Sequence, residues 1–259
     1  MLLLKNIYKK FGGLLAVNGT SFTVEKGTIK GLIGPNGAGK TTLFNIIAGM
    51  IAPSSGQIFL DGENITNLKP YELFNKGLLR TFQISQEFST LTVRDNLLMV
   101  PSNQPGENLY YSWFSPFKVK QFEKEIQKKA DEVIQFLELE NVSSELAKNL
   151  SGGQKKLLEL GRTMMVDAKI VFLDEVGAGV NRTLLNKIGE LILKLNRDKG
   201  YTFCMIEHDM EFISRLCKSV TVMAEGSVLA EGSVNEIKNN DEVIEAYLGK
   251  QNNKNGQKV

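Results

Sequence analysis

Long apolar runs are absent from this sequence of 259 residues. A membrane-spanning helix needs about 18 or more consecutive apolar residues. No stretch meets that requirement, so we expect no spanning segment, and any role at a membrane must come through a partner. Residues 1–7 are apolar but lack a basic leader, a long apolar core and a cleavage site. We therefore interpret them as a first strand rather than a signal peptide.

Cysteine and histidine are also scarce, since the chain has two cysteines and one histidine. Cys204 and Cys217 match no metal-binding or redox spacing, which indicates reduced thiols in a cytosolic protein. The formal net charge is only +2, which argues against a dedicated nucleic-acid surface. The length permits one large domain, or one domain with an inserted subdomain.

A glycine-rich segment in the first fifth of the chain carries the clearest chemical signal. Residues 34–42, GPNGAGKTT, match the phosphate-binding pattern G-x-x-x-x-G-K-[ST], between an apolar strand and a helix. Glycines let consecutive backbone N–H groups face one anion, and the helix N-terminus adds its positive end. We expect Lys40 to reach the β- and γ-phosphates of a nucleotide and the Thr41 hydroxyl to ligate Mg²⁺. The predicted nucleotide-binding residues are Gly34, Asn36, Gly37, Ala38, Gly39, Lys40, Thr41 and Thr42.

The first 30 residues predict an antiparallel β layer, with strands at 2–7 and 16–24 and a turn at residues 12–13. Phe11 would lie in that turn. Its ring either stacks on an adenine or packs in the core, and the sequence does not choose between the two. Residues 77–83 predict a short strand that ends at Gln83. By itself, a glutamine at a strand end indicates a solvated residue more often than a ligand.

From about residue 84 to residue 150 the pattern predicts a helical insertion. Thr92 and Asp95 have capping-box spacing, and an amphipathic helix covers the region of residues 122–137. The aromatic cluster of this insertion has two interpretations, a small satellite core or a partner-facing patch, and we favour the core. The cluster consists of Tyr110, Tyr111, Trp113, Phe114 and Phe117.

The insertion ends at residues 150–154, LSGGQ. Ser151 and Gln154 have capping-box spacing before a helix predicted over 155–166. A helix cap does not need two glycines. Because Gly152 and Gly153 have no side chains, they would leave backbone N–H groups accessible beside the serine hydroxyl. This combination predicts a second phosphate-binding surface. Ser-Gly-Gly also occurs in flexible loops, so the prediction depends on the phosphate loop that precedes it in the chain.

Two buried strands, predicted at 169–173 and 201–206, each end in polar side chains. Asp174 is placed to hold Mg²⁺, and Glu175 to orient and deprotonate an attacking water. The second strand should lie beside the first, which brings His208 to the γ-phosphate. Because ligands bind at the carboxyl ends of parallel strands, these residues and the phosphate loop predict a P-loop nucleotide triphosphatase. A last hairpin at 221–230 and one terminal helix over 234–248 complete the chain.

Together, and in this order, the motifs resemble the ATP-binding subunit of an ABC transporter over about residues 3–248. The resemblance implies an α/β fold: a P-loop NTPase core with an N-terminal antiparallel β layer and an inserted α-helical subdomain. The core would comprise residues 1–83 and 159–249, and the helical subdomain residues 84–158. Residues 250–259 would form a disordered tail.

The resemblance also implies a head-to-tail dimer, with a second copy or a similar cassette. The phosphate loop of one subunit and residues 151–154 of the other would enclose one ATP. Phe11 would stack on adenine, and Gln83 would contact Mg²⁺ and the attacking water. Transmembrane permease subunits would dock at the helical subdomain on the cytoplasmic face of the membrane, with a substrate-binding protein as an indirect partner and no nucleic acid. The catalytic residues would be Glu175, His208, Gln83 and Lys40, the metal ligands Thr41, Gln83 and Asp174, and the signature residues Ser151, Gly152, Gly153 and Gln154.

Within the family, residues 11–17, 34–45, 80–83 and 246–249 are similar to ATPase subunits of branched-chain amino acid importers. Urea or other amide and amino acid importers, and lipopolysaccharide exporters, remain alternatives within transport. A soluble ABC ATPase and a non-hydrolytic regulatory module are alternatives outside it. The sequence departs from the family pattern at Val176, where proline is common, which would loosen the backbone after the catalytic glutamate. It also departs at residues 179–181, GVN, where the family more commonly has a Leu-Asp ending of the loop.

Overall fold

The computed structural model describes residues 1–81, 87–102, 104–107 and 113–252. The chain divides into two compact units, which are described separately. We call the first the α/β unit, made of Met1–Arg80, Lys169–Gly177 and Ile192–Val259. We call the second the helical unit, made of Thr81–Ala168 and Ala178–Leu191.

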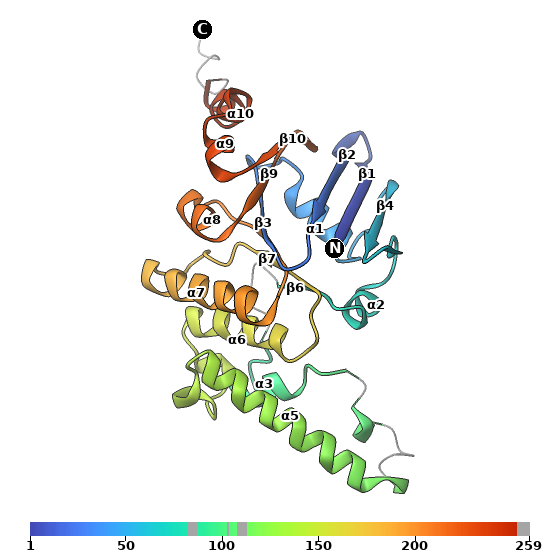
Figure 1. Ribbon diagram of the computed structural model, residues 1–259, viewed down its shortest axis with the longest axis vertical. Helices are drawn as coiled ribbons and strands as arrows, with labels where there is room; N and C mark the ends of the chain where they lie inside the picture. The colour runs from blue at the N-terminus through green and yellow to red at the C-terminus, as the bar shows by residue number, and fades with distance from the viewer. Residues whose placement is uncertain (82–86, 103, 108–112, 253–259) are drawn as a thin grey trace. The chain divides into compact units, whose positions relative to one another are not determined.

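The α/β unit begins with the predicted antiparallel layer, a four-stranded sheet in the order β2-β1-β4-β5. Figure 1 shows β1, β2 and β4 side by side. Leu2, Leu4 and Ile7 of β1 are buried, and the alternation expected for a sheet with one face in the core is interrupted by a register shift between Leu4 and Ile7. The first strand is longer than predicted, so Phe11 is its last residue rather than part of the turn. The strands are β1 (Leu2–Phe11), β2 (Leu14–Val24), β4 (Ser55–Leu60) and β5 (Glu63–Asn64).

The second sheet of this unit has six strands in the order β10-β9-β3-β8-β7-β6. All neighbouring pairs are parallel except the hairpin of β9 and β10. Asp174 is opposite Ile206 in the parallel register, so the predicted neighbourhood of these two strands is confirmed. The strands are β3 (Ile29–Ile33), β6 (Leu78–Arg80), β7 (Ile170–Asp174), β8 (Phe203–Ile206), β9 (Ser219–Ala224) and β10 (Ser227–Gly232).

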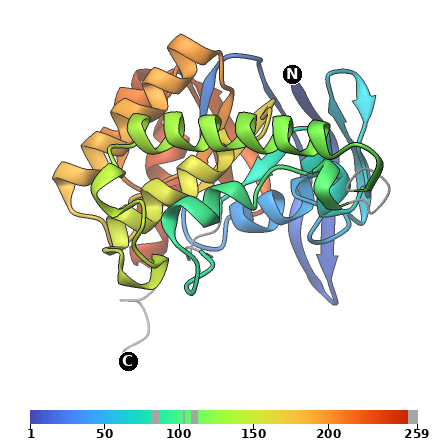
Figure 2. The same cartoon turned by 90° about the horizontal axis from the view of Figure 1, so that it is seen from below.

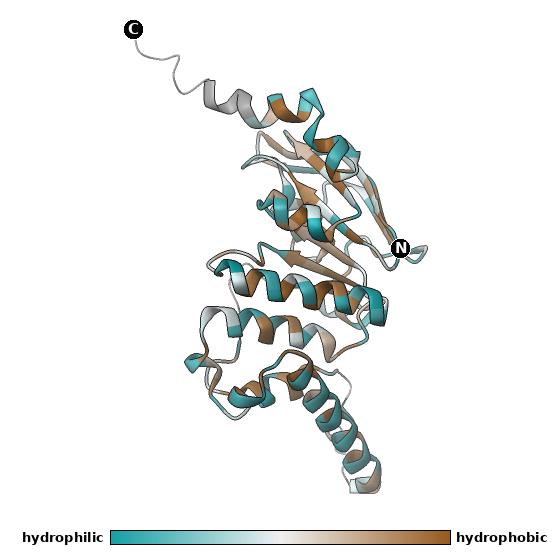
Figure 3. Cartoon of the chain, turned by 60° about the vertical axis from the view of Figure 1, so that its left-hand side comes forward, coloured by the Kyte–Doolittle hydropathy of each residue, from teal (hydrophilic) through white to brown (hydrophobic). Residues whose placement is uncertain are grey.

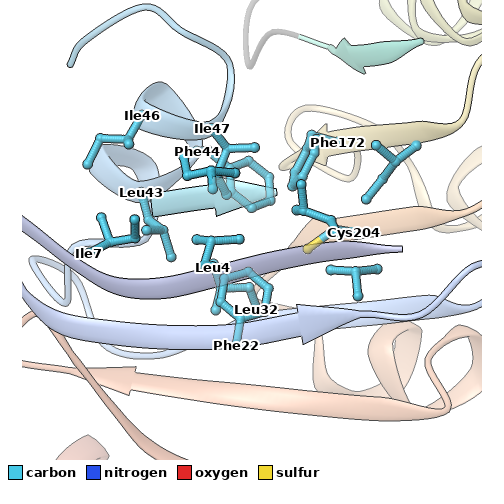
Figure 4. Packing of buried hydrophobic residues seen from close by; sticks show 14 of the residues in the cluster. Leu4, Ile7, Phe22, Leu32, Leu43, Phe44, Ile46, Ile47, Phe172 and Cys204 are labelled. Atoms are coloured by element: carbon cyan, nitrogen blue, oxygen red, sulfur yellow. The ribbon is translucent and has the colours of Figure 1, made fainter. Parts of the chain in front are cut away.

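Helix α1 (Lys40–Ile47) shares one hydrophobic core with both sheets. Leu4 comes from the first sheet and Leu32 from the second, and α1 contributes Phe44 (Figure 4). The Phe44 ring meets the Phe172 ring edge to face, with centroids 4.9 Å apart. Burying one such side chain contributes on the order of 1.5–3 kcal/mol, so this core fixes the start of α1 against the ends of β3 and β7.

The C-terminal segment forms two helices, so the prediction of a single helix over 234–248 is wrong. Ser233 caps α9 (Val234–Lys238), and the chain then breaks at Asn239. Asn240 restarts it, because its side-chain oxygen accepts a hydrogen bond from the Val243 N–H at the start of α10 (Asp241–Asn252). The first three residues of the predicted disordered tail therefore belong to a helix, and residues 253–259 lie outside the described part. The other helices of this unit are α2 (Pro70–Asn75), α8 (Met210–Leu216) and the last turns of α7 (Arg182–Lys199).

The helical unit contains the predicted amphipathic helix as α5 (Pro116–Phe136), the green helix of Figure 2. Ile126, Ala130, Val133 and Ile134 form its buried side, and Figure 3 shows hydrophilic and hydrophobic residues mixed along it. The predicted cap at Thr92 is confirmed, since its hydroxyl accepts a hydrogen bond from the Asp95 N–H. The other elements are α3 (Val93–Leu98), α6 (Gly152–Met164) and the 3₁₀ turns η1 (Pro105–Glu107), η2 (Glu140–Val142) and η3 (Ala147–Asn149).

The division into compact units lies elsewhere than the predicted boundary at 158/159. Helix α6 is continuous across that point and lies wholly in the helical unit, where it packs against α3 and α5. A Cβ on Gly161 would lie 2.6 Å from Leu137 and 3.2 Å from Leu97, so backbone and side chains approach closely there. Residues 178–191 also join the helical unit.

The aromatic cluster of the helical unit is exposed, so the favoured interpretation as a satellite core is wrong for its described members. Trp113 is 82% exposed, Phe114 69% and Phe117 79%. Helix α5 buries the side that carries Ile126 and Val133, and Phe117 lies on the opposite side of its helical wheel. The two tyrosines of the cluster, Tyr110 and Tyr111, lie outside the described residues.

Candidate nucleotide-binding and active site

The predicted phosphate loop joins the carboxyl end of β3 to the first turn of α1. Two of its glycines are required by their surroundings. A Cβ on Gly34 would lie 2.1 Å from the carbonyl oxygen of Met223, and one on Gly39 would lie 2.4 Å from that of Ala16. Gly39 also has φ +95°, in the left-handed region that glycine adopts without strain. The loop is therefore held closely by the strands on both sides.

Lys40 is the first residue of α1 and is 6% exposed. Its Nζ donates hydrogen bonds to the carbonyl oxygens of Gly34, at 2.7 Å, and Pro35, at 3.1 Å. Burial lowers the pKa of the Lys40 ammonium, while the carboxylates of Glu175 and Asp174 act in the opposite direction. The cation is thus kept over the loop by backbone oxygens, which a phosphate oxygen is able to replace.

A pocket of about 500 Å³ opens over the loop. This volume is within the usual range for small-molecule sites. The pocket brings together the predicted residues 36–42, Glu175 and His208. It also includes residues that the sequence analysis missed, namely Leu14, Leu15, Ala16, Glu225 and Gly226.

Two of the missed residues, Ala16 and Gly226, meet the loop through their backbone, which leaves no chemical signature in the sequence. The Gly226 N–H donates a hydrogen bond to the carbonyl oxygen of Ala38, at 3.1 Å, and the Gly226 carbonyl accepts one from the Asn18 N–H. The β9–β10 turn is therefore tied both to the phosphate loop and to β2. The only sequence signal is the glycine itself, at the tip of a predicted hairpin.

The two acids after β7 point to different partners, as the sequence predicted. The Glu175 Oε1 lies 3.2 Å from the His208 Nε2, at the end of the neighbouring strand β8. Asp174 is 3% exposed, and its Oδ2 accepts a hydrogen bond from the Arg80 Nη2, at 2.7 Å. Glu175 has φ +49°, which turns the chain sharply between the two side chains.

The donor set beside the loop suits a magnesium ion. Thr41 supplies a hydroxyl at the pocket, and Asp174 supplies a buried carboxylate. Mg²⁺ that travels with a nucleotide takes only one or two protein ligands besides phosphate oxygens and water. Within the described ranges no cluster of three or more histidine, cysteine or acidic side chains is placed to hold a metal ion. Gln83, the third predicted ligand, lies outside those ranges.

Phe11 ends β1 and is 48% exposed. The Nζ of Lys9 lies 5.0 Å from the centroid of its ring. Among the described residues, the pocket lining begins at Leu14, three positions further along the chain. Phe11 pairs with Leu14 in the β1–β2 ladder, so its ring is exposed beside a residue of the pocket wall but is not part of that wall.

The signature segment opens α6 with the predicted capping box. The Ser151 Oγ accepts a hydrogen bond from the Gln154 N–H, and the Gln154 Oε1 accepts one from the Ser151 N–H, at 2.9 Å. A Cβ on Gly152 would meet nothing within 4 Å, whereas one on Gly153 would lie 1.6 Å from the Cδ2 of Leu184. The segment is therefore open on one side and packed on α7 on the other, all within the helical unit.

Comparison with known families decides the identity of this arrangement. A model of the ABC transporter family matches residues 17–178, which include the phosphate loop, the signature and both acids after β7. The chain belongs to the ABC transporter family. A second model, for the branched-chain amino acid ATP-binding cassette transporter, matches residues 227–251, which span β10, α9 and most of α10.

Curated ABC proteins similar to this chain cover nearly its full length. A probable branched-chain amino acid transport ATP-binding protein LivG of Archaeoglobus fulgidus is 42% identical, over 95% of each chain. The corresponding protein of Methanocaldococcus jannaschii is 38% identical, over 95% of this chain and 96% of the other. The high-affinity branched-chain amino acid transport ATP-binding protein BraF of Pseudomonas aeruginosa is 37% identical, over 93% and 94%.

Solved ABC cassettes share the fold. A nucleotide-free ATP-binding cassette from an ABC transporter has a TM-score of 0.81 and 37% identity, over 95% of this chain and 98% of the other. The ADP conformation of an ATP-binding cassette has a TM-score of 0.81 and 36% identity, over 96% and 98%. A dimeric cassette in a post-hydrolysis state with ADP and Pi has a TM-score of 0.73 and 25% identity, over 90% and 99%.

Family membership confirms several predictions. The chain has the expected P-loop NTPase core with an N-terminal antiparallel layer and a helical insertion. It is an ATP-binding protein and an ABC-type ATP hydrolase coupled to transport.

Proposed function

We propose that this ABC ATPase powers the uptake of branched-chain amino acids through partner permease subunits. The pocket that gathers residues 36–42, Glu175 and His208 carries the ATPase part of the proposal. The substrate class is supported by the printed functions of the full-length relatives and by the family match at residues 227–251. The ATPase subunit itself need not contact the cargo, so its geometry does not select the amino acid.

The phosphate loop binds the β- and γ-phosphates of ATP in this proposal. Its N–H groups and the N-terminus of α1 face the anion, and Lys40 exchanges the carbonyls of Gly34 and Pro35 for phosphate oxygens. Thr41, Asp174 and Gln83 would hold Mg²⁺, which when bound neutralises charge on the phosphate oxygens. The ring of Phe11 stacks on the adenine, which its 48% exposure at the end of β1 permits.

Glu175 serves as the general base and takes a proton from the attacking water. His208 contacts the γ-phosphate, and the 3.2 Å separation from Glu175 keeps both groups near one reacting centre. Gln83 orients the same water in this account. A positioned base is worth on the order of 10²–10⁴-fold in rate, which makes Glu175 the residue whose loss should be most visible in turnover.

The second half of each ATP site comes from another cassette, either a second copy of this chain or a similar subunit. Ser151, Gly152, Gly153 and Gln154 would bind the γ-phosphate of the partner's ATP. The open side of Gly152 and the helix N-terminus at Ser151 suit that role. The dimeric solved cassette supports the association. ATP binding closes this dimer, and hydrolysis reopens it.

Permease subunits dock at the helical unit, and the chain thereby lies at the cytoplasmic face of the membrane. Within the described residues, every helix is too short or too polar to cross a bilayer. Trp113, Phe114 and Phe117 provide exposed apolar surface of the kind that marks a protein interface. A substrate-binding protein delivers the amino acid to the permease and does not touch this chain. We expect no nucleic-acid partner.

Reconstitution tests the proposal. The permease that co-purifies with this chain from membranes is placed in liposomes with the ATPase inside and its substrate-binding protein outside, and uptake of labelled leucine, urea and a lysine control is compared. The account predicts ATP-dependent leucine accumulation that unlabelled isoleucine and valine suppress, and no accumulation with Glu175→Gln. Uptake of urea instead of leucine would show that the transporter is a urea importer. A partner that exports lipid would show that transport runs outward rather than inward. A chain that co-purifies with no membrane protein at all would favour a soluble ABC ATPase.

A further inference from the structure

Arg80 connects three parts of the α/β unit that the sequence keeps far apart. It is the last residue of the edge strand β6. Its Nη2 donates to the Asp174 Oδ2 at the end of β7, at 2.7 Å, and its Nη1 donates to the side-chain oxygen of Asn45 in α1. Its guanidinium carbon lies 5.9 Å from the centroid of the Phe44 ring, also in α1.

The contact is buried and directional. The side chains of Arg80 and Asp174 are 9% and 4% exposed. A guanidinium is a rigid planar fork, so its two terminal nitrogens keep a fixed geometry toward two acceptors. The Nε of Arg80 has no hydrogen-bond partner among the described residues, which is a desolvation cost that a well-packed apolar side chain would avoid. Retention of a buried ion pair at that cost points to a role other than stability alone.

The two acceptors are both beside the nucleotide site. Asp174 is the proposed magnesium ligand, and Asn45 lies one and a half helical turns after Lys40 on the helix that begins at the phosphate loop. The guanidinium of Arg80 therefore sets the orientation of the Asp174 carboxylate relative to α1. Metal-binding carboxylates commonly depend on such outer hydrogen bonds, and their loss costs on the order of 10–100-fold in metal affinity or activity.

We propose that Arg80 is a positioning residue that holds the Asp174 carboxylate for the magnesium ion of Mg-ATP by bridging it to Asn45. The proposal rests on the function proposed above and deepens it. Arg80 touches neither nucleotide nor metal in this account. It acts through Asp174. Its removal should therefore lower the part of the ATP affinity that depends on Mg²⁺, and leave the affinity of the phosphate loop for ATP without Mg²⁺ unchanged.

Arg80→Lys is the main variant, because lysine keeps the positive charge but, as a point charge, does not bridge two acceptors in a fixed plane. The dissociation constant of a fluorescent ATP analogue is measured with excess EDTA and with saturating Mg²⁺, and the ratio of the two values is compared with that of the wild type. Arg94→Lys is the control, since Arg94 pairs with Asp131 on the surface of the helical unit. Thermal unfolding without nucleotide is recorded for all variants.

The account predicts that Arg80→Lys lowers the Mg²⁺-dependent gain in affinity by about tenfold, in line with other outer-shell substitutions, and changes the affinity in EDTA by less than twofold. Arg94→Lys should leave both values unchanged. An unchanged ratio in Arg80→Lys would overturn the proposal, and so would an equal loss with and without Mg²⁺, because that result indicates general damage to the pocket.

Asn45→Ala keeps the proposal testable if Arg80→Lys does not fold, since it removes one end of the bridge and retains the ion pair with Asp174. It should lower the same ratio in the same direction, and an unchanged ratio in a folded Asn45→Ala protein would contradict the bridging role. Failure of the wild type to bind the analogue would instead count against the proposed function. The two failures are therefore distinguishable.

Discussion

The Oε1 of Glu175 and the Nε2 of His208 lie 3.2 Å apart, across the ends of the neighbouring parallel strands β7 and β8. The sequence separates these residues by 33 positions, and the register that sets Asp174 opposite Ile206 brings them together. The pair lies at the edge of the sheet where ligands of open α/β folds bind.

Glu175→Gln should bind ATP and lose most of its turnover, by roughly 10²–10⁴-fold, because glutamine retains the size of the side chain but does not accept the proton of the water. Phosphate release and equilibrium ATP binding measure the two quantities separately. Hydrolysis near the wild-type rate would remove Glu175 from the role of base.

Ser151→Arg should abolish most of the ATPase activity and leave ATP binding to the single chain intact. Arginine at this N-cap removes the hydroxyl that accepts from the Gln154 N–H and fills the surface proposed to receive the partner's phosphate. Binding is measured at protein concentrations where the chain is a monomer. An equal loss of monomer binding and activity would show that this segment acts within its own chain.

Gly152 and Gly153 form a matched pair for the packing of the signature segment. Gly153→Ala should lower the free energy of unfolding by about 1–3 kcal/mol, because its Cβ would meet both the Cδ2 of Leu184, at 1.6 Å, and its Cγ, at 2.9 Å. The Cβ of Gly152→Ala would meet nothing within 4 Å, so this variant should have the unfolding midpoint of the wild type or a slightly higher one. Chemical unfolding of both variants checks the difference, and equal midpoints would contradict the close contact.

Glu207 gives a pH dependence of stability with a defined sign. It is 5% exposed, and burial raises the pKa of its carboxyl above the ordinary value of 4.5, against the opposing hydrogen bonds from the Gly177 and His208 N–H groups. The folded state therefore binds this proton more tightly than the unfolded chain does, and its contribution to stability falls as the pH rises from 4.5 through the folded pKa.

Glu207→Gln removes this titration and retains an acceptor for the Gly177 N–H. The unfolding midpoint of the variant relative to the wild type should accordingly be higher at about pH 8 than at about pH 5. Urea unfolding at both pH values makes the comparison. A difference that is constant with pH, or that shrinks toward pH 8, would show that Glu207 is not held in a desolvated site.

The cysteines should be inert in the folded protein. Cys204 and Cys217 are both free and buried, and burial raises the pKa of the Cys217 thiol to about 12 and that of Cys204 further. The thiolate, which is the reactive form, is therefore scarce at neutral pH. A disulfide reagent should label neither residue in the native chain and both in denaturant. Rapid labelling of the native chain would contradict the burial.

Much of the site follows from local sequence because its parts are local devices. A phosphate loop, a capping box and a buried strand that ends in acids each depend on residues within a few positions of one another, as at Gly34–Thr42 and Ser151–Gln154. These features were recognisable without a structure. The family resemblance added the head-to-tail dimer and the roles of Phe11 and Gln83.

The rest depends on contacts between distant segments. Arg80 meets Asn45 across 35 positions and Asp174 across 94, and no pattern near any of the three indicates the bridge. Glu225 and Gly226 join the pocket by the return of a hairpin. Phe117 is a residue type common in cores, and it is exposed because α5 turns its opposite side, with Ile126 and Val133, into the helical unit.

The mass of Glu175→Gln in solution with saturating Mg-ATP tests the central claim most directly. The account predicts a particle of about twice the 28.8 kDa of one chain, which reverts to a single chain when nucleotide is removed or when Ser151→Arg is added to the variant. A mass that stays at that of one chain at every protein concentration, while ATP remains bound, both alone and after addition of the similar cassette that co-purifies from membranes, would contradict the head-to-tail site.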